Sequence, residues 1–391
     1  MKILMIAPEP FFRLRGTPFS IRQRLEALCE FGYRVDLLTY PFGAEVNLRG
    51  LRIFRSFRPF WIKNVKIGPS WGKIPLDFFL FLKAIFFVCR KGYDCVHTHE
   101  EAGFLGAGIK KIFGIPHVYD MHSSLPEQLV NYKFIHSPVL LKLAQIAEGW
   151  LLRNSSAIIA ICPYLADWAR KNADKDKIFL IENLALLHDE VKAANEGIEL
   201  LNKLKSEGSE IVLYTGTFEY NQGLDLLIEA ASLVIKSRPG VKFVLVGGIE
   251  EKINKFRRFA EKLGLNNAVL FTGKRPPEEM AAFMAGSDIL VSPRRIGNNT
   301  PLKIYSYLFS GKPIVATDIS SHTQVLNRQV SVLTEISAAG IAGGILKLLE
   351  NKDLGGKLAE AAEEYAGRRF SREQYLSRVK RLYQLVASKT K

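Results

Sequence analysis

The sequence predicts an α/β protein of two facing, doubly wound Rossmann-like domains with a cleft between them. Short apolar runs rich in β-branched residues alternate with helical patterns along all 391 residues, as expected for parallel sheets covered by helices on both faces. About thirteen such runs occur, which is more than one open twisted sheet usually holds. A polar segment at 183–210 has no strand pattern and separates two series of runs.

Seven of the strand-like runs precede the polar segment and six follow it. The first seven are Lys2–Ala7, Val35–Thr39, Leu51–Phe54, Cys95–His97, Pro116–Tyr119, Ala157–Ile161 and Ile178–Ile181. The last six are Ile211–Tyr214, Lys242–Val246, Val269–Thr272, Ile289–Ser292, Pro313–Ala316 and Val330–Leu333. Helical periodicity predicts helices at Ile21–Phe31, Leu140–Leu152, Leu224–Lys236, Ile253–Leu263, Pro277–Ala285, Leu302–Ser310, Ile341–Glu350 and Arg372–Ala387.

These patterns divide the chain into four parts. We expect an N-terminal Rossmann-like domain at 1–184, a linker at 185–210, a C-terminal Rossmann-like domain at 211–370 and a terminal helical segment at 371–391. Open parallel sheets bind ligands at the carboxyl ends of their strands. Two sheets with those ends facing each other would form one deep cleft, which suits a reaction between two substrates.

Positive charge is concentrated in one stretch of the first domain. The net charge is +15, and the stretch Arg49–Lys73 holds seven basic residues, no acidic residue and several interleaved aromatic side chains. A basic surface with exposed aromatics suits an anionic membrane surface or nucleic acid. A solvated basic face whose aromatics belong to the core is the alternative. No nucleic-acid-binding motif accompanies the charge, so the sequence favours peripheral membrane contact and no nucleic acid.

The cysteines and the apolar runs exclude several classes of protein. The four cysteines form no CxxC pair and no metal-ligand spacing, which indicates free thiols in a reducing compartment rather than disulfides or zinc. The N-terminal apolar run is too short for a signal peptide. Pro75–Cys89 is the most apolar segment, but it contains Asp77 and Lys83 and is too short to span a bilayer. We expect a buried helix there, with a place in the bilayer interface as the alternative.

A glycine-containing loop follows the first strand of each of the two series. The first carries Arg13, Arg15 and Gly16, and the second has Gly216 and Gly223 at its two ends. Glycine lets the backbone approach a ligand, and the helix that follows favours an anion at its N-terminus. Neither loop has the GxGxxG pattern of dinucleotide sites or the Gly-Lys-Ser/Thr of a P-loop. The second loop therefore suits a diphosphate without being a recognised nucleotide motif.

A third loop, Pro293–Pro301, follows the strand Ile289–Ser292 and leads into a helix. It carries Arg294 and Arg295, and Lys303 follows in the first turn of that helix. Arginine forks match the planar oxygens of a phosphate. Surface arginines beside an ordinary helix cap are the alternative.

Histidines mark the ends of two strands of the first series. His122 follows the run Pro116–Tyr119, where its side chain would face the ligand edge of the sheet and position a hydroxyl or carry a proton. His97 and His99 end another strand, and HxH is a metal-ligating pattern, but no third ligand is evident by spacing. A structural role is the alternative for each of them.

The chain resembles the retaining glycosyltransferases of family 4, which have the two-domain GT-B fold. The resemblance covers essentially the whole chain, and its strongest stretches are Arg15–Thr17 through Tyr33–Pro41, Tyr214–Phe218 with Gly223–Ala230, and Gly311–Thr317. It implies that the first domain holds the acceptor and that the second holds a nucleoside-diphosphate sugar. It also implies that the final helix, Arg372–Ala387, packs back toward the N-terminal domain.

The resemblance assigns roles to particular residues. It places Gly16 near the donor phosphates and makes His122 the catalytic histidine beside the donor sugar. Arg15, His99 and Ser123 would line the acceptor side of the cleft. The donor-binding residues would be Gly216, Thr217, Gln222, Arg294, Arg295, Asn298, Asn299, Thr300, Lys303 and Ser306.

Four positions depart from the family pattern. The family usually has Arg and Lys where this chain has Thr217 and Gln222, and two glutamates where it has Asn298 and Ser306. Each lost charge-assisted hydrogen bond to a diphosphate would cost roughly 1.5–3 kcal/mol. We hypothesise that Arg294, Arg295 and Lys303 replace the missing positive charge. Asn298 and Ser306 would then hydrogen-bond hydroxyl groups of the donor.

The implied reaction transfers a hexose from a nucleotide sugar to an acceptor hydroxyl with retention, in envelope glycan or glycolipid synthesis. No cofactor and no metal ion are expected, because no carboxylate pair is placed to hold one. We expect a cytoplasmic protein, peripheral at the inner face of the membrane. A catalytically inactive carbohydrate-binding homologue is the first alternative. A sugar-nucleotide 2-epimerase is the second, although Asn298 and Ser306 are poor substitutes for the carboxylates that it needs.

Overall fold

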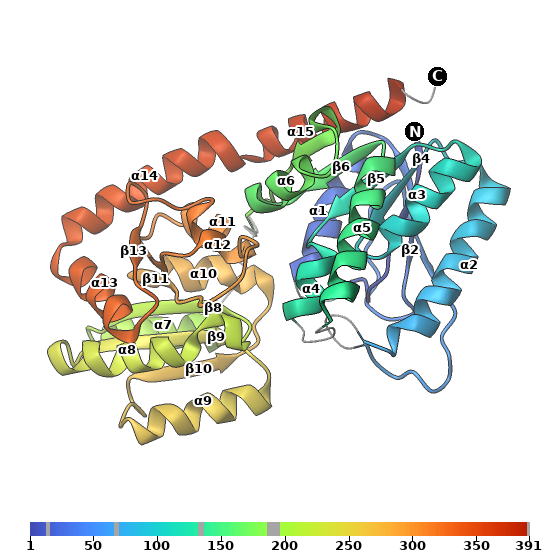
Figure 1. Cartoon of the computed structure of the whole chain (residues 1–391). Coiled ribbons are helices and arrows are strands. Elements are labelled where there is room, and N and C mark those ends of the chain that lie inside the picture. Colours follow the sequence, from blue (N-terminus) through green and yellow to red (C-terminus); the bar gives the residue numbers. More distant parts are fainter. Residues whose placement is uncertain (13–15, 66–69, 132–136, 186–195, 389–391) are drawn as a thin grey trace. The chain divides into compact units, whose positions relative to one another are not determined.

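The computed structural model describes residues 1–12, 16–65, 70–131, 137–185 and 196–388. The chain divides into two compact units, one made of 1–183 together with 372–391 and the other of 184–371. Each unit contains one wholly parallel sheet with helices on both faces (Figure 1). The predicted architecture of two doubly wound α/β domains is confirmed, and every one of the thirteen predicted runs forms a strand.

The first unit is built on a seven-stranded sheet of order β3-β2-β1-β4-β5-β6-β7. Its strands are β1 Lys2–Ala7, β2 Arg34–Thr39, β3 Leu51–Arg55, β4 Cys95–His99, β5 His117–Met121, β6 Ala157–Ala160 and β7 Ile178–Leu180. Its helices are α1 Gly16–Glu30, α2 Lys73–Lys91, α3 Ala102–Phe113, α4 Leu125–Asn131, α5 Pro138–Asn154, α6 Pro163–Arg170 and α15 Arg372–Ser388, with a short 3₁₀ turn at Lys175–Lys177.

The second unit is built on a six-stranded sheet of order β10-β9-β8-β11-β12-β13. Its strands are β8 Glu210–Gly216, β9 Val241–Gly247, β10 Val269–Gly273, β11 Ile289–Ser292, β12 Ile314–Thr317 and β13 Val332–Thr334. Its helices are α7 Glu196–Ser206, α8 Leu224–Ser237, α9 Glu250–Lys262, α10 Met280–Ala285, α11 Leu302–Leu308, α12 Ser320–Thr323, α13 Ala338–Glu350 and α14 Lys352–Phe370, with 3₁₀ turns at Tyr220–Gln222 and Pro277–Glu279.

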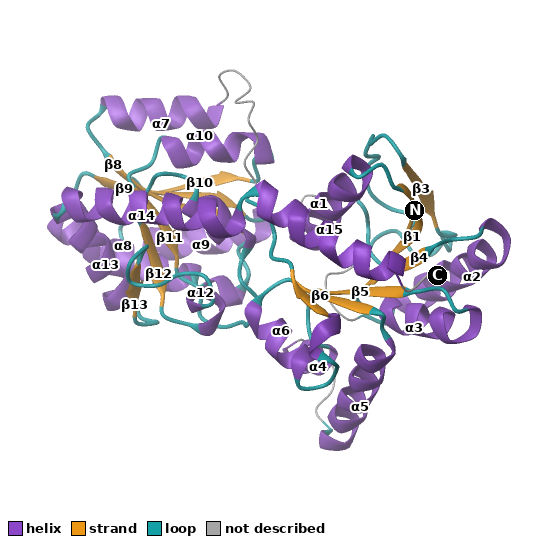
Figure 2. Cartoon of the chain, turned by 90° about the horizontal axis from the view of Figure 1, so that it is seen from above, coloured by secondary structure: helices purple, strands orange, loops and turns teal. Residues whose placement is uncertain are grey.

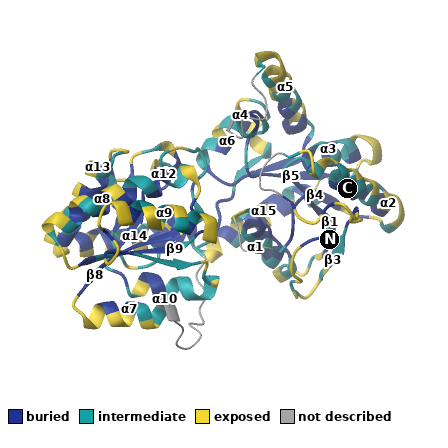
Figure 3. Cartoon of the chain, turned by 90° about the horizontal axis from the view of Figure 1, so that it is seen from below, coloured by how far each residue is buried: buried dark blue, intermediate teal, exposed yellow. Residues whose placement is uncertain are grey.

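Three helices of the second unit were not anticipated: α7, α14 and the four-residue α12. Residues 196–206, inside the predicted linker, form α7, whose Leu201 and Leu204 pack into a core of the second unit with Phe283 and Ile304. That part of the polar segment is therefore a structural element of the unit. Helix α14 was also missed, because its alanines and glycines give a weak apolar pattern; its Ala362 and Phe370 reach the same core. The inner strands of both sheets are deeply buried, whereas the edge strands β3, β7, β10 and β13 are only partly buried (Figure 3).

The strand orders place a topological switch point in each sheet. In the first sheet the chain runs outward from β1 to β3 and then returns to β4 on the other side of β1. In the second it runs from β8 to β10 and returns to β11 beside β8. Doubly wound sheets bind ligands in the crevice at the carboxyl ends of such strands. Ligand-binding residues are therefore expected in the loops after β1 and β4 in the first unit, and after β8 and β11 in the second.

Helix α2 is buried on one face only. Leu76, Leu80, Ala84 and Phe87 pack into the first unit's core, whereas the opposite face is exposed to solvent. The expectation of a buried helix at 75–89 is thus correct for half of its surface. Among the described residues, no helix combines the length and the apolar character needed to cross a membrane.

Helix α15 follows the second unit in sequence and packs beside α1 in the first unit, over the same face of the first sheet (Figure 2). A buried ion pair joins these elements: Arg24 of α1 donates from Nε to Asp120 of β5 at 3.0 Å, and from Nη1 to the hydroxyl of Tyr375 of α15 at 3.0 Å. Both charged side chains are about 1% exposed. Burial opposes the charge of Asp120, but Arg24 and the neighbouring histidines together outweigh it and hold the pKa of the carboxyl well below its usual range.

Replacing Arg24 with leucine should destabilise the first unit by roughly 3–5 kcal/mol, because it leaves the Asp120 carboxylate buried without a partner. All four tryptophans lie in the first unit, so denaturant unfolding followed by tryptophan fluorescence reports on that unit. The matched control is Arg22→Leu on the same helix, since Arg22 and Glu26 form an ion pair whose side chains are 36% and 39% exposed. The control should cost less than about 1 kcal/mol, and equal losses would contradict the assignment.

Candidate functional site

The ligand edge of the first sheet gathers three histidines and one aspartate. Alternation along β4 and β5 puts His97, His99 and Asp120 on the face covered by α1 and α15. His122 follows β5 on the same side, and its Nε2 lies 3.0 Å from Nδ1 of His99 and 3.5 Å from Oδ1 of Asp120. His97 hydrogen-bonds the Tyr383 hydroxyl of α15 through Nδ1. The predicted site residues His99 and His122 therefore belong to one buried polar cluster that α15 completes.

The histidines of this cluster are neutral at physiological pH. Burial lowers the pKa of His122 to about 4, and it lowers the pKa values of His97 and His99 as well. Asp120 raises the pKa of each imidazole, but burial outweighs this effect. A neutral imidazole at this edge acts as a hydrogen-bonding group toward a hydroxyl rather than as a fixed cation.

Asp120 is the third potential metal ligand that sequence spacing did not reveal. One ligand atom from each of His97, His99 and Asp120 lies within 4.8 Å of the others. The guanidinium of Arg24, however, donates to the same carboxylate at 3.0 Å. A divalent cation there would face that fixed positive charge at close range, so the group does not fit a metal ion well.

Glu100, directly after β4, is a site residue that the sequence analysis missed. Among the described residues it is the only one other than glycine with a positive φ, 49°. Its carboxylate accepts hydrogen bonds from Ser123 at 3.0 Å and from Gln128 at 2.9 Å. Burial and the neighbouring Glu101 raise its pKa to about 7. The predicted residue Ser123 thus orients a carboxyl group that accepts or donates a proton near neutral pH.

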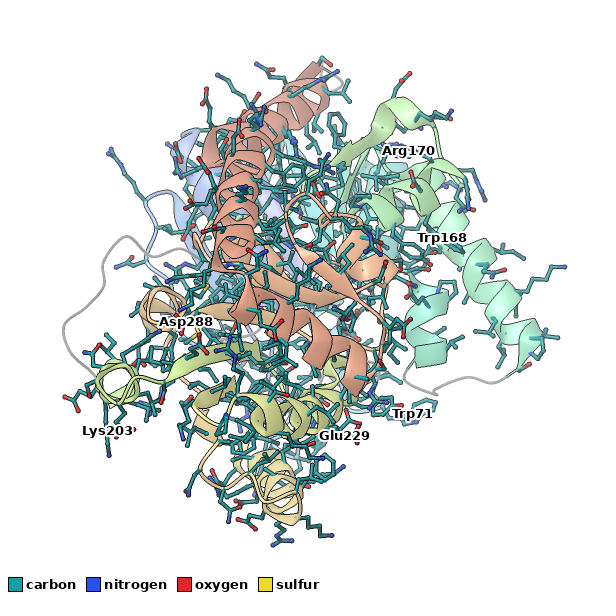
Figure 4. All side chains as sticks on the ribbon, turned by 90° about the vertical axis from the view of Figure 1, so that its left-hand side faces the viewer. Trp71, Trp168, Arg170, Lys203, Glu229 and Asp288 are labelled. Atoms are coloured by element: carbon teal, nitrogen blue, oxygen red, sulfur yellow. The ribbon has the colours of Figure 1, made fainter. Side chains whose placement is uncertain are left out.

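A small cavity opens beside Glu100 within the first unit. Its wall includes Tyr119, Ser123, Gln128 and Leu151. Glu148, another wall residue, accepts a hydrogen bond from the indole of Trp168 at 2.7 Å, and Figure 4 labels that tryptophan. Gly16, the predicted donor-side glycine, begins α1 and is exposed. Arg15 lies outside the described residues.

In the second unit, the loops after β8 and β11 are interlocked. Gly223 has φ 70°, and a Cβ there would lie 2.0 Å from the carbonyl oxygen of Pro293. The backbone N–H of Arg295 donates to the carbonyl of Asn221 at 3.0 Å. Only glycine allows this approach, so the loop at the end of β8 and the loop at the end of β11 form one surface at the switch point.

The two arginines of the predicted donor loop hold the loop itself together. Arg294 is 9% exposed and donates to the carbonyls of Ile296 and Asn299 at 2.9 and 3.0 Å. Arg295 forms an ion pair with Asp225 of α8 and lies over the ring of Tyr220. In this conformation neither guanidinium is uncommitted, and both stabilise the surface on which a ligand would sit.

Lys303 differs from the arginines. Its ammonium nitrogen is fully buried and, within the described parts of the chain, has no hydrogen-bond acceptor. The nitrogen lies 3.8 Å from the centre of the Tyr214 ring and 3.2 Å from the place where a Cβ on Gly216 would be. Burial, with Arg294 nearby, holds the pKa of Lys303 well below its usual range. Thr300, one turn earlier, has a buried hydroxyl that also lacks a partner among the described residues.

The neutral residues at the family's charged positions lie in the loops after β8 and β11 and on α11. The Tyr214 hydroxyl donates to the carbonyl of Thr217 at 2.7 Å and to Oε1 of Gln222 at 3.3 Å. Asn298 accepts from Gln324 through its backbone carbonyl at 2.6 Å. Asn299 receives a hydrogen bond from Arg294, and Ser306 is 5% exposed on α11. These residues are polar, and none adds charge.

His322 of α12 is a further residue that the sequence analysis did not single out. Its Nδ1–H donates to the carbonyl of Thr317 at 2.8 Å, so Nε2 accepts from the Ser292 hydroxyl at 2.9 Å. Burial lowers its pKa to about 3. The neutral ring supports the end of β11 below the loop. Only the folded chain brings α12 to this strand, so spacing gives no signal for it.

A pH-dependent destabilisation tests the assignment of buried neutral histidines. His117 lies under α3 and hydrogen-bonds Thr98 at 2.6 Å, and burial lowers its pKa to about 3. Its contribution to stability is therefore present above the unfolded pKa near 6.5 and is lost as the pH falls toward 3. His117→Asn should destabilise the first unit at pH 7, and that loss should shrink by about 2 kcal/mol at pH 5. A difference between wild type and variant that stays constant from pH 7 to pH 5, by tryptophan fluorescence, would contradict the assignment.

Family models match both halves of the chain. A model of glycosyltransferase family 4 matches residues 15–184, and a model of group 1 glycosyl transferases matches residues 199–369. The D-inositol 3-phosphate glycosyltransferase of Corynebacterium urealyticum is 25% identical over 395 residues, covering 94% of this chain and 90% of its own. The alpha-monoglucosyldiacylglycerol synthase of Streptococcus pneumoniae is 25% identical over 315 residues, covering 74% and 68%.

Solved structures share the fold over nearly the whole chain. Sucrose-phosphate synthase from Thermosynechococcus elongatus has a TM-score of 0.77 at 19% identity and covers 98% of both chains. Anabaena HepE in complex with UDP has a TM-score of 0.75 at 20% identity, covering 99% of this chain and 100% of its own. These likenesses show the two-domain GT-B fold. Since the two family models together match most of the sequence, the chain belongs to the group 1, family 4 glycosyltransferases.

Proposed function

We propose that this glycosyltransferase moves a hexose from a nucleoside-diphosphate sugar to an acceptor hydroxyl with retention at the anomeric carbon. The second unit holds the donor and the first holds the acceptor. The observation that carries the proposal is the buried ammonium group of Lys303, which has no acceptor among the described residues and lies beside the Gly216 loop.

A buried ammonium without a partner is costly, because burial removes its hydration and no carboxylate compensates. Such a group is retained where a ligand supplies the missing negative charge. The place of Lys303, next to the ends of β8 and β11, is the switch point at which doubly wound sheets bind ligands. A diphosphate meets both requirements, because its oxygens are anionic and accept hydrogen bonds from Lys303, Thr300 and the backbone amides after Gly216.

The relatives support the chemical class of both substrates. HepE has been solved with UDP and with UDP-glucose, which favours a nucleotide-sugar donor here. The streptococcal relative is a synthase of a glucosyldiacylglycerol lipid, which favours a lipid-linked or envelope glycan acceptor. A lipid-linked acceptor in turn places the protein at the inner face of the cytoplasmic membrane, through the basic stretch Arg49–Lys73.

Lys303 and the supported loop would stabilise the charge that develops on the departing diphosphate. The resemblance puts His122 beside the donor sugar, where a neutral imidazole accepts or donates a hydrogen bond to a hydroxyl without adding charge. An oxygen of the donor phosphate would take the acceptor proton, so the reaction needs neither a protein nucleophile nor a metal ion. Asn298 and Ser306 would contact hydroxyl groups of the donor.

The neutral residues Thr217, Gln222, Asn298 and Ser306 favour one other candidate, a homologue that binds carbohydrate without catalysis. The two functions differ in nucleotide binding. A thermal-shift screen of nucleotide sugars separates them, because a bound donor raises the unfolding temperature by mass action. No shift with any donor would support the inactive homologue.

Lys303→Met should weaken nucleoside-diphosphate binding by about 10- to 150-fold, the range that corresponds to a charge-assisted hydrogen bond of about 1.5–3 kcal/mol. The same substitution should leave the free protein as stable as before or more stable, because it replaces a buried unpaired charge with an apolar side chain of similar length. Isothermal titration with UDP, the nucleotide bound by HepE, and thermal unfolding measure the two effects.

The control is Lys205→Met, because Lys205 forms a surface ion pair with Asp288 in the same unit and its side chain is 39% exposed. Figure 4 labels Asp288. The control should bind UDP as the wild type does. A Lys303→Met protein that unfolds more easily and still binds UDP normally would show that the lysine is structural.

His122→Asn should lower kcat by about 10²-fold, the lower end of the range for loss of one hydrogen bond that stabilises the transition state. The UDP affinity of this variant should match that of the wild type, because the phosphate contacts lie in the second unit. Steady-state kinetics with the donor found in the thermal screen, together with calorimetry, separate the two quantities. A change confined to UDP affinity would place His122 outside the catalytic role.

A further inference from the structure

The outer face of α2 presents a continuous apolar stripe to solvent. Ile74, Phe78, Leu82 and Phe86 recur every four residues and are 56%, 58%, 53% and 50% exposed. Residues at this spacing lie one above another on a helix. The stripe does not come from a loose helix, since the opposite face of α2 is anchored in the core of the first unit.

The segment before α2 extends the apolar surface. Phe60, Trp61 and Trp71 are 87%, 61% and 75% exposed, and Figure 4 labels Trp71. Phe57 is also exposed, and its ring lies 4.8 Å from that of Phe79 on α2. The Ile74 amide donates to the Trp71 carbonyl at 3.3 Å. These contacts join the aromatic segment to the first half of α2.

This concentration is local to one part of the chain. Among the described residues, fifteen large hydrophobic side chains are at least half exposed; eight of them lie between Phe57 and Phe86, and two belong to the second unit. Exposed apolar side chains scattered singly are normal, whereas a contiguous patch on a soluble protein marks an interaction site. The surface formed by the exposed side chains of 57–86 is called the α2 surface below.

Cations border the α2 surface. Arg58 and Lys63 are exposed beside the aromatic segment. Arg90 lies 4.8 Å from the centre of the Phe86 ring at the far end of the stripe. The acidic side chain on α2 itself, Asp77, is turned toward the interior and bonded to the Tyr40 hydroxyl. An apolar stripe with tryptophans and a basic border suits the interface of an anionic bilayer.

We propose that the α2 surface docks on an anionic lipid bilayer, with α2 lying in the plane of the interface. The proposal rests on the proposed function in one respect, because a lipid-linked acceptor requires the first unit to meet the membrane. It specifies the partner and the contacting residues, and it takes up the alternative that the sequence left open for Pro75–Cys89, a place in the bilayer interface.

Sedimentation of the full chain with vesicles tests the proposal. Binding should be strong to vesicles made of equal parts phosphatidylcholine and phosphatidylglycerol, weaker to phosphatidylcholine alone, and reduced by salt that screens the charges. Because Trp61 and Trp71 lie on the α2 surface, tryptophan emission should shift to shorter wavelength on binding. Leu82→Glu should weaken binding to the mixed vesicles by at least about tenfold, which corresponds to about 1.4 kcal/mol.

The matched control is Ile249→Glu, because Ile249 is a 46% exposed apolar residue on the second unit. This control variant should bind vesicles as the wild type does. Both variants should keep the wild-type unfolding midpoint and UDP affinity, so loss of vesicle binding with UDP binding intact is the expected result. Equal loss in both variants, or no loss in Leu82→Glu, would overturn the proposal. A self-associating protein that ignores vesicles and is made monomeric by Leu82→Glu would also overturn it, since a second copy would then cover the surface. Failure of UDP binding alone would overturn the donor assignment and leave this proposal standing.

Discussion

Each unit keeps a buried basic side chain at the ligand edge of its sheet, and the two side chains differ in whether the protein supplies a counter-charge. Arg24 has Asp120 at 3.0 Å and the Tyr375 hydroxyl at the same distance, so its charge is compensated and joins α1, β5 and α15. Lys303 has an aromatic ring but no hydrogen-bond acceptor among the described residues. A paired buried charge fixes a structure, whereas an unpaired one implies a ligand.

That difference separates the supporting parts of each unit from the parts available for chemistry. In the first unit, burial keeps His122 neutral beside the Arg24–Asp120 pair, and Glu100 holds a carboxyl group with a pKa of about 7. In the second unit, hydrogen bonds of Arg294 and His322 stabilise β11 and the loop after it, and Lys303 takes no part in them. The α2 surface adds a third feature, an apolar face that the fold leaves uncovered.

The sequence predicted the strands well, because a buried parallel strand needs a short apolar run and its neighbours need helices. It also placed His99, His122 and Ser123 at strand ends or in the loops after them, and Lys303 in the first turn of the helix after Pro293–Pro301. It did not find Glu100, whose backbone conformation has no signature in the sequence. Nor did it find the partners of Arg294 and Arg295: Arg294 donates within its own loop, and Arg295 pairs with Asp225 of α8, which only the fold brings to that loop. The two arginines were expected to bind phosphate, yet the fold uses them to hold their own loop and α8.

The central claim is that a diphosphate supplies the charge that Lys303 lacks. Because burial depresses the pKa of that lysine, an arriving anion should raise it and draw a proton from solution. Calorimetric titration with UDP at pH 8, in two buffers with different ionisation enthalpies, measures the protons exchanged on binding. If the diphosphate contacts Lys303, the wild-type protein takes up more protons on binding UDP than the Lys303→Met variant does. Equal proton exchange in the two proteins would contradict the central claim.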